Sequence, residues 1–127
     1  MDKNVLTLAD LGDAIYELYI RKYLIEQGIV KVDALQKAAT KYVSAKGQAS
    51  YLTSLLENNL LKEDELEIVF RARNHKGTRH PKNTDIITYK YATGLEALIG
   101  YLYLNHNKAR IEEIMNFVRG DYNVRIW

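Results

Sequence analysis

The sequence predicts an all-α fold built as a single compact domain. Apolar residues recur at intervals of about 3.6 residues rather than in alternation, in stretches dominated by Leu, Ala, Ile, Lys, Glu and Tyr. The one proline, Pro81, lies in the clearest interruption of this pattern. A chain of 127 residues has the size of one ordinary domain, and it contains no internal repeat and no long linker. We therefore treat residues 1–127 as one helical domain.

The first predicted helix covers about residues 6–27, and Gly28 is well placed to end it. Its inner face is predicted from apolar residues at helical intervals, which are Leu8, Leu11, Ile15 and Leu18. A second helix is expected over residues 32–43. Ser44 is a suitable N-cap for a third helix over about residues 45–60. The inner face of the third helix is expected at Leu52, Leu55 and Leu56.

Charged residues mark both ends of a fourth helix, predicted over about residues 62–74. Acidic side chains complement the positive start of this helix, and basic side chains complement its end. The acidic residues are Glu63, Asp64 and Glu65, and the basic ones are Arg71 and Arg73. The loop HKGTRHPKN, residues 75–83, follows because Gly77 and Pro81 interrupt helical continuation.

Two further helices complete the predicted fold. A long helix runs from residue 84 or 85 to about residue 105, and the last helix covers about residues 108–119 before Gly120. The expected core residues of the long helix are Leu95, Leu98, Ile99 and Leu102.

Composition excludes several classes of function. The chain has no cysteine, which rules out disulfides, thiolate zinc sites and thiol catalysis and fits a reducing compartment. No apolar run approaches the ~20 residues that cross a bilayer. Acidic residues occupy the place where a secretory signal has its apolar stretch. We expect a soluble cytoplasmic protein with no membrane partner.

Two acidic residues lie within stretches that otherwise have the composition of a helix core. Asp13 lies in LTLADLGDAIYEL, and Glu96 lies in YATGLEALIGYLYL. Burial of an unpaired carboxylate is costly, so each requires a cation, a basic partner or a proton. Magnesium prefers oxygen ligands, and one or two carboxylates with phosphate oxygens are enough to anchor it. Gly12 and Gly100 would let helices approach each other closely beside these acids.

The stretches LGDAIYE and LEALIGYLYL, in this order, resemble the two acidic signatures of the ribonuclease III family. The segments GDAIYELYIR, VSAKGQA, RARN, PKNTD and TYKY are similar to the compact bacterial branch of that family, the Mini-ribonuclease III enzymes. This resemblance spans roughly residues 6–104. It implies a single ribonuclease III-like endonuclease domain without a double-stranded-RNA-binding domain, in which Asp13 and Glu96 are the catalytic and Mg²⁺-binding residues.

The resemblance also implies a substrate and partners. It predicts cleavage of both strands of double-stranded RNA, leaving 5′-phosphate and 3′-hydroxyl ends with a short 3′ overhang. It further implies maturation of the ends of 23S ribosomal RNA precursor, with a large-subunit ribosomal protein presenting the substrate. A homodimer is expected because two-fold pairing would put two cutting centres on opposite strands of one duplex.

The acidic set departs from that of the larger family. Two positions that carry acids in full-length ribonuclease III hold Ala9 and Thr93 here, so a cation would keep more water ligands. Three other acids are possible accessories, namely Asp10, Glu17 and Asp85. Asp10 is one residue out of register, Glu17 shares a face with Asp13, and Asp85 is better suited to a helix cap or a substrate contact.

Residues 68–84 contain no acid and supply the chain's main concentration of positive charge. Such a segment suits RNA phosphates, which attract Lys and Arg regardless of sequence. The predicted RNA-binding residues of this segment are Arg71, Arg73, Asn74, Lys76, Thr78, Arg79, Lys82 and Asn83. A weaker second candidate is formed by Lys46 with Lys41, Ser44 and Gln48, whose alternative role is helix capping and solubility.

Two other functions remain open at this stage. The chain could be a non-catalytic helical RNA-binding or ribosome-assembly module whose reduced acidic set no longer supports turnover. It could also be a metal-dependent phosphohydrolase that acts on small nucleotides. Zinc hydrolysis is disfavoured because none of the three histidines has a helical partner at metal-ligand spacing.

Overall fold

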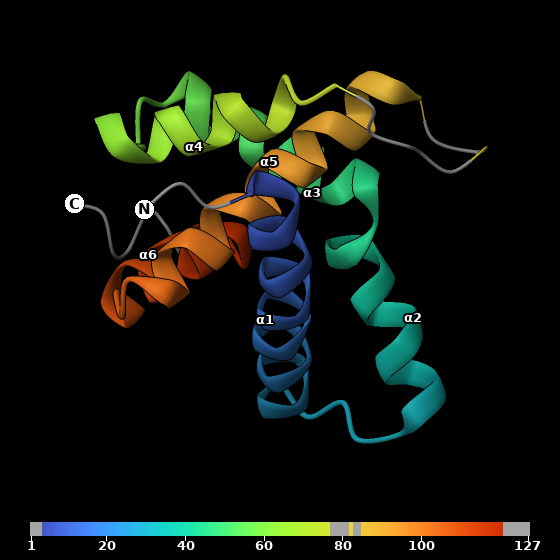
Figure 1. Cartoon of the computed structure of the whole chain (residues 1–127). Coiled ribbons are helices and arrows are strands. Elements are labelled where there is room, and N and C mark those ends of the chain that lie inside the picture. Colours follow the sequence, from blue (N-terminus) through green and yellow to red (C-terminus); the bar gives the residue numbers. More distant parts are fainter. Residues whose placement is uncertain (1–3, 77–81, 83–84, 121–127) are drawn as a thin grey trace.

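The computed structural model describes residues 4–76, 82 and 85–120. Within these residues the chain forms six helices and no strand, which confirms the predicted all-α class (Figure 1). In chain order the helices are α1 (Val5–Glu26), α2 (Val32–Val43), α3 (Ala45–Glu57), α4 (Glu63–Arg73), α5 (Ile86–Leu104) and α6 (Lys108–Val118).

Side-chain caps fix the beginnings of four helices. The side chains of Asn4, Ser44, Asp85 and Asn107 accept hydrogen bonds from backbone N–H groups in the first turns of α1, α3, α5 and α6, respectively. These bonds satisfy donors that a helix start leaves without partners. Gly28 and Gly120 have φ of 101° and 93°, a backbone conformation that glycine adopts without strain and that ends α1 and α6.

Helix α3 is shorter than expected. It ends at Glu57 rather than near residue 60, because Asn59 adopts a φ of 53°. The N–H of Leu60 then bonds back to the carbonyl of Leu55 at 3.1 Å and closes the helix end. Asparagine tolerates this left-handed conformation better than most residues. Asn59 therefore ends α3, although the apolar pattern in the sequence continues to residue 60.

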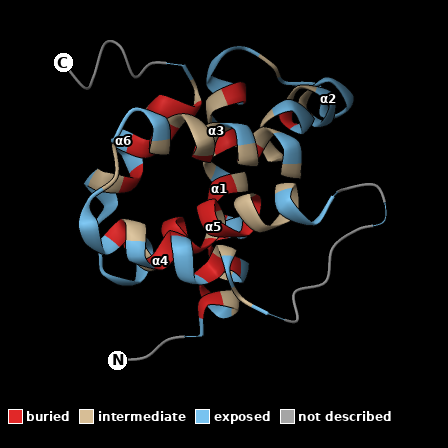
Figure 2. Ribbon diagram, turned by 90° about the horizontal axis from the view of Figure 1, so that it is seen from above, coloured by how far each residue is buried: buried red, intermediate tan, exposed pale blue. Residues whose placement is uncertain are grey.

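Helix α5 forms the centre of the core. Helices α1, α3 and α4 all pack against it, and nine of its residues are buried. Figure 2 shows buried residues concentrated where α1 and α5 meet, whereas α2 is mostly exposed. All four predicted core residues of α5 are buried, and Tyr16, Ile20 and Leu52 fill the space around them.

The prediction for Leu18 was wrong. Its side chain is 64% exposed, although Leu8 and Ile15 of the same predicted face are buried. The buried stripe of α1 follows steps of four residues through Tyr16 and Ile20, and Leu18 lies about 200° around the helix from Tyr16.

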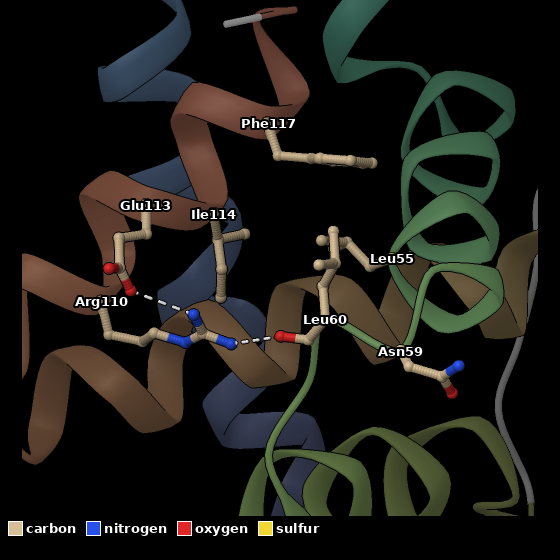
Figure 3. A pocket seen from close by; sticks show the side chains of 7 residues that line it. All are labelled: Leu55, Asn59, Leu60, Arg110, Glu113, Ile114 and Phe117. Atoms are coloured by element: carbon tan, nitrogen blue, oxygen red, sulfur yellow. Dashed lines mark hydrogen bonds and ion pairs between the residues drawn. The ribbon is translucent and has the colours of Figure 1, made fainter. Parts of the chain in front are cut away.

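An ion pair joins the start of α4 to α6. Glu65, predicted only to complement the helix start, is buried and accepts two bonds from Arg110, at 2.8 and 2.9 Å. Its carboxylate also accepts from the backbone N–H of Lys62. Arg110 further binds Glu113 and the carbonyl of Leu60, at the edge of a cavity of about 310 Å³ (Figure 3).

Candidate active site

Two glycines bring the backbones of α1 and α5 into direct contact. A Cβ added at Gly12 would lie 1.7 Å from the carbonyl oxygen of Glu96, and one added at Gly100 would lie 2.0 Å from the carbonyl oxygen of Leu8. Real Cβ atoms do not approach so closely, so only glycine permits this crossing. Asp13 follows Gly12 directly, and its position beside Glu96 is therefore fixed by the crossing.

Asp13 and Glu96 interact across this crossing. Burial raises the pKa of Glu96 to about 8, and the negative charge of Asp13 and a side-chain contact with it act in the same direction. Asp10 adds a smaller repulsion. Among the described residues, the strongest influences on the pKa of Glu96 include Asp13 and Asp10 but no Lys or Arg.

The pair of carboxylates fits a magnesium ion. Within residues 4–76, 82 and 85–120, no group of three or more Asp, Glu or His side chains could hold a metal ion. Magnesium does not need such a group, because it usually keeps several waters and binds through one or two carboxylates with substrate phosphates. The donors present are hard oxygens, and the unfavourable placement of Glu96 beside Asp13 is one that a divalent cation would relieve.

The three accessory acids occupy different surroundings. Asp10 is exposed and lies near enough to Glu96 to repel it. Glu17 is bound to Arg21 at 2.9 Å, one turn further along α1. Asp85 is the N-cap of α5, where it accepts hydrogen bonds from the backbone N–H and the hydroxyl of Thr88, both at 2.8 Å. The structure therefore brings only Asp10 toward the Asp13 and Glu96 pair.

Gln48 is a member of the site that sequence reasoning placed elsewhere. It was grouped with candidate RNA contacts, but its side chain is only 2% exposed and cannot reach a bound duplex. Its amide lies toward Glu96 and acts to lower the pKa of that carboxyl, against the larger effects of burial and Asp13. The contact stops short of a hydrogen bond, since Nε2 of Gln48 has no partner of acceptable geometry in the described part of the chain.

The other residues of that second RNA-binding candidate divide into two roles. Ser44 caps α3 by accepting a hydrogen bond from the N–H of Gly47 at 3.1 Å, which is the alternative role considered for it. Lys46 is exposed in the first turn of α3, and Lys41 is exposed near the end of α2, over the ring of Tyr42. Only the two lysines remain available to a ligand.

Basic and polar residues gather at the end of α4. Arg71, Asn74 and Lys76 are exposed, as is Lys82 beyond them. The guanidinium of Arg73 lies 4.6 Å from the centre of the Phe70 ring and 5.5 Å from that of Tyr91 on α5. The predicted RNA contacts Thr78, Arg79 and Asn83 lie outside the described residues.

The Arg73 contact relates this basic end to the acidic pair. Tyr91 lies five residues before Glu96 on the same continuous helix, a rise of about 7.5 Å along its axis. Stacking on two rings also holds the guanidinium in place, and its Nε–H donates to Oδ1 of Asn74 at 3.4 Å. The end of α4 is thus a positive surface within reach of any polyanion that is bound at the carboxylates.

Comparison with known proteins identifies the family. A profile of the Ribonuclease III domain matches residues 6–107. The chain belongs to the ribonuclease III family. The chain is 48% identical over 114 residues to the Mini-ribonuclease 3 of Enterococcus faecalis, with 90% of this chain and 86% of that protein covered. It is 52% identical over 112 residues to the Mini-ribonuclease 3 of Brevibacillus brevis, with 88% and 82% covered.

A solved structure shows the same fold. The crystal structure of protein FN1578 from Fusobacterium nucleatum superposes with a TM-score of 0.83 at 39% sequence identity, over 92% of this chain and 93% of that one. The two Mini-ribonuclease 3 relatives and the domain profile identify the chain as a member of the Mini-ribonuclease III branch. Membership of the ribonuclease III family places the chain among RNA endonucleases. Among the described helices, none is long and apolar enough to cross a membrane.

Proposed function

We propose that this protein is a magnesium-dependent endoribonuclease that cleaves double-stranded RNA, with Asp13 and Glu96 as its metal-binding and catalytic residues. The observation that carries the proposal is the crossing of α1 and α5, which brings two carboxylates together, and within the described residues the largest influences on Glu96 include two acids and no Lys or Arg. Members of the ribonuclease III family generally use a divalent metal.

The chain's own residues divide the work of phosphodiester hydrolysis. When bound, a divalent cation supplies positive charge that stabilises the developing charge on phosphate oxygens and activates the attacking water. Asp13, which is exposed, and Glu96, which is less exposed, would hold the cation through their carboxylates. Gly12 and Gly100 allow the backbones that carry the two acids to approach closely, because a side chain at either position would overlap the facing helix.

The RNA backbone would lie along the end of α4. Arg71, Arg73 and Lys76 provide positive charge there, and Asn74 provides a hydrogen-bonding side chain. Thr78, Arg79, Lys82, Asn83 and Lys46 complete the proposed contact set. These side chains suit recognition by shape and phosphate charge, which is how proteins read a duplex RNA whose major groove is too narrow for side chains.

The resemblance to Mini-ribonuclease III supports a biological substrate and an assembly. We propose that the enzyme matures the ends of 23S ribosomal RNA precursor in the cytoplasm, with a large-subunit ribosomal protein presenting the RNA. A homodimer would place one Asp13 and Glu96 pair at each strand of the duplex.

Cleavage of a structured RNA by purified variants tests the proposal. Asp13→Asn and Glu96→Gln keep side-chain shape but remove a charge, so both should fold and both should lose cleavage by at least about 100-fold, given the several kcal/mol that a catalytic cation contributes. Glu26→Gln is the matched control, since it removes an exposed carboxylate from the same α1 and should cut as the wild type does. Full activity of both active-site variants at limiting Mg²⁺ would falsify the assignment.

The same assay separates the two other functions. A non-catalytic RNA-binding module would bind the duplex and leave it uncut with or without Mg²⁺. A phosphohydrolase of small nucleotides would hydrolyse nucleoside triphosphates at a rate that excess duplex RNA does not reduce.

A further inference from the structure

Gln48 is unusual among the buried polar side chains. Three such residues occur in the described part of the chain, namely Gln48, Glu65 and Thr93. Glu65 is bonded to Arg110 and to the N–H of Lys62, and Thr93 donates to the carbonyl of Tyr89 at 2.9 Å. Gln48 is the exception, because its Nε2 has no partner.

An amide left in this state is destabilising. A buried donor without a partner costs about 1–3 kcal/mol, and an apolar side chain of the same shape would avoid that cost. Few such groups persist in folded proteins, and those that do call for an explanation such as a catalytic role or an ion. Thus the free N–H of Gln48 points to a bond that forms only when the site is complete.

The packing of α3 directs Gln48 at one carboxylate. Leu52, one turn after Gln48, contacts the backbone of α5 at Gly94, where an added Cβ would lie 3.2 Å from the leucine side chain. Because residues four apart share a helix face, Gln48 also faces α5. On that helix the amide of Gln48 reaches Glu96, and it is the only group among the strongest influences on the pKa of Glu96 that favours the charged carboxylate.

We propose that Gln48 is a positioning residue for the metal site, whose side-chain N–H donates to one oxygen of Glu96 and leaves the other oxygen directed at the cation. The inference rests on the proposed function and extends it to a residue on a third helix. A donor on the far side of a carboxylate fixes the ligand's orientation, and removal of such outer partners typically lowers metal affinity about 10–100-fold. Asp13 on α1, Glu96 on α5 and Gln48 on α3 then form one unit.

Gln48→Met tests this role, because methionine has a similar length and volume but cannot donate. The metal-free variant should be as stable as the wild type or more so in urea unfolding, since an unsatisfied amide has been removed. Its affinity for Mn²⁺, followed in EDTA-treated protein by the electron paramagnetic resonance signal of the free ion, should fall about 10-fold. The Mg²⁺ concentration for half-maximal cleavage should rise by a similar factor, with full activity restored at high Mg²⁺ and the KM for RNA unchanged.

Two controls separate the possible failures. Leu52→Met substitutes a buried side chain on the same face of α3 with little change of volume, and it should bind Mn²⁺ as the wild type does. Asp13→Asn should lose Mn²⁺ binding. If Asp13→Asn loses the ion and Gln48→Met retains wild-type affinity, Gln48 only fills space and the inference is wrong. If Asp13→Asn also binds the ion normally, the proposed metal site itself is wrong.

Discussion

Glu96 is a carboxylate that the fold keeps largely out of water beside two other acids. Burial and the charge of Asp13 raise its pKa to about 8, and the charge of Asp10 adds to this effect. A carboxyl in this state holds a proton at neutral pH when no cation is present. Binding of a divalent cation must displace that proton, so affinity for the ion should increase with pH.

The metal-free protein should lose stability as pH rises from about 4.5 to about 8. Between the ordinary pKa of Glu96, 4.5, and its raised value, the folded chain holds a proton that the unfolded chain has released. Stability therefore falls with pH, by at most about 1.4 kcal/mol per pH unit for one proton. Urea unfolding in EDTA at several pH values measures the slope.

Other groups also titrate in this range, so the decisive quantity is the difference from Glu96→Gln. That variant has no proton to lose at position 96, and its stability should fall less steeply with pH. Saturating Mg²⁺ should reduce the slope of the wild type toward that of the variant. Identical slopes for the two proteins without metal would mean that Glu96 is ionised in the folded chain.

Sequence patterns predicted some residues of the candidate site and missed others for a physical reason. Asp13 and Glu96 were singled out because each is an acid within an apolar stretch, and the structure brings them together. Gln48 and Glu65 were not predicted to be buried, since a polar residue in an amphipathic helix ordinarily faces solvent. Their burial depends on which partner arrives from another helix, and the spacing within their own helices does not carry that information.

At the scale of helices, the crossing of α1 and α5 determines the geometry of the site. The contact is between backbones, at Gly12 against Glu96 and at Gly100 against Leu8. Helix axes this close cannot shift without opening the core around Tyr16 and Leu98. The relative position of Asp13 on α1 and Glu96 on α5 thus depends on this crossing.

Gly12→Ala should lower both stability and cleavage. The added Cβ would overlap the Glu96 carbonyl, so the helices must separate at a cost of at least about 1–3 kcal/mol, with the two carboxylates displaced. Thermal unfolding and cleavage assays measure the two effects. Gly94→Ala is the control on α5, because its Cβ would lie 3.2 Å from the side chain of Leu52 and 3.4 Å from the side chain and carbonyl oxygen of Val69, and helix propensity offsets part of that milder crowding. Equal losses in both variants would contradict a special role for the crossing.

The ion pair between Glu65 and Arg110 should be necessary for the attachment of α4 to α6. Arg110→Met leaves the Glu65 carboxylate, 1% exposed, without its counter-ion, which typically costs about 3–5 kcal/mol. Glu113→Gln removes only the exposed partner of Arg110 and should cost about 0–1 kcal/mol. The double variant Glu65→Met and Arg110→Met should recover much of the loss in urea unfolding, because no charge is then left buried. If the double variant recovers no stability, the loss comes mainly from the hydrogen bonds of Glu65 rather than from its unbalanced charge.

The helices themselves were largely predictable because their signals are local. Asp85, Ser44, Gly28 and Gly120 act within one turn of the helix that they begin or end, and the structure places helix ends beside all four. Leu18 was predicted to be buried because its spacing also fitted the apolar stripe of α1. The sequence of α1 fits two apolar stripes, one through Leu18 and one through Tyr16 and Ile20. The position of α5 determines which stripe is buried, and the local sequence of α1 does not contain that information.

At the scale of the whole molecule, exposed apolar side chains gather on one side of α1 and at the end of α5. Leu18 and Ile25 lie two turns apart on the same face of α1, and both are exposed. Tyr103 on α5 is 52% exposed. It lies near Tyr19, whose pKa is raised by burial, by Glu112 and, to a smaller extent, by Tyr103. Large apolar side chains gathered in this way are typical of an interface.

We expect this surface to hold the proposed homodimer together. The wild type should sediment at twice its chain mass of 14.7 kDa. Leu18→Glu should sediment as a folded monomer, because the two-fold interface would then have to bury a glutamate carboxylate from each subunit. Val30→Glu is the control, since Val30 is exposed but lies in the connection between α1 and α2. The Leu18→Glu monomer should also lose paired cutting of the two strands, so that remaining products are nicked duplexes on a native gel. A wild-type monomer, or a Leu18→Glu dimer that cuts both strands, would place the partner surface elsewhere.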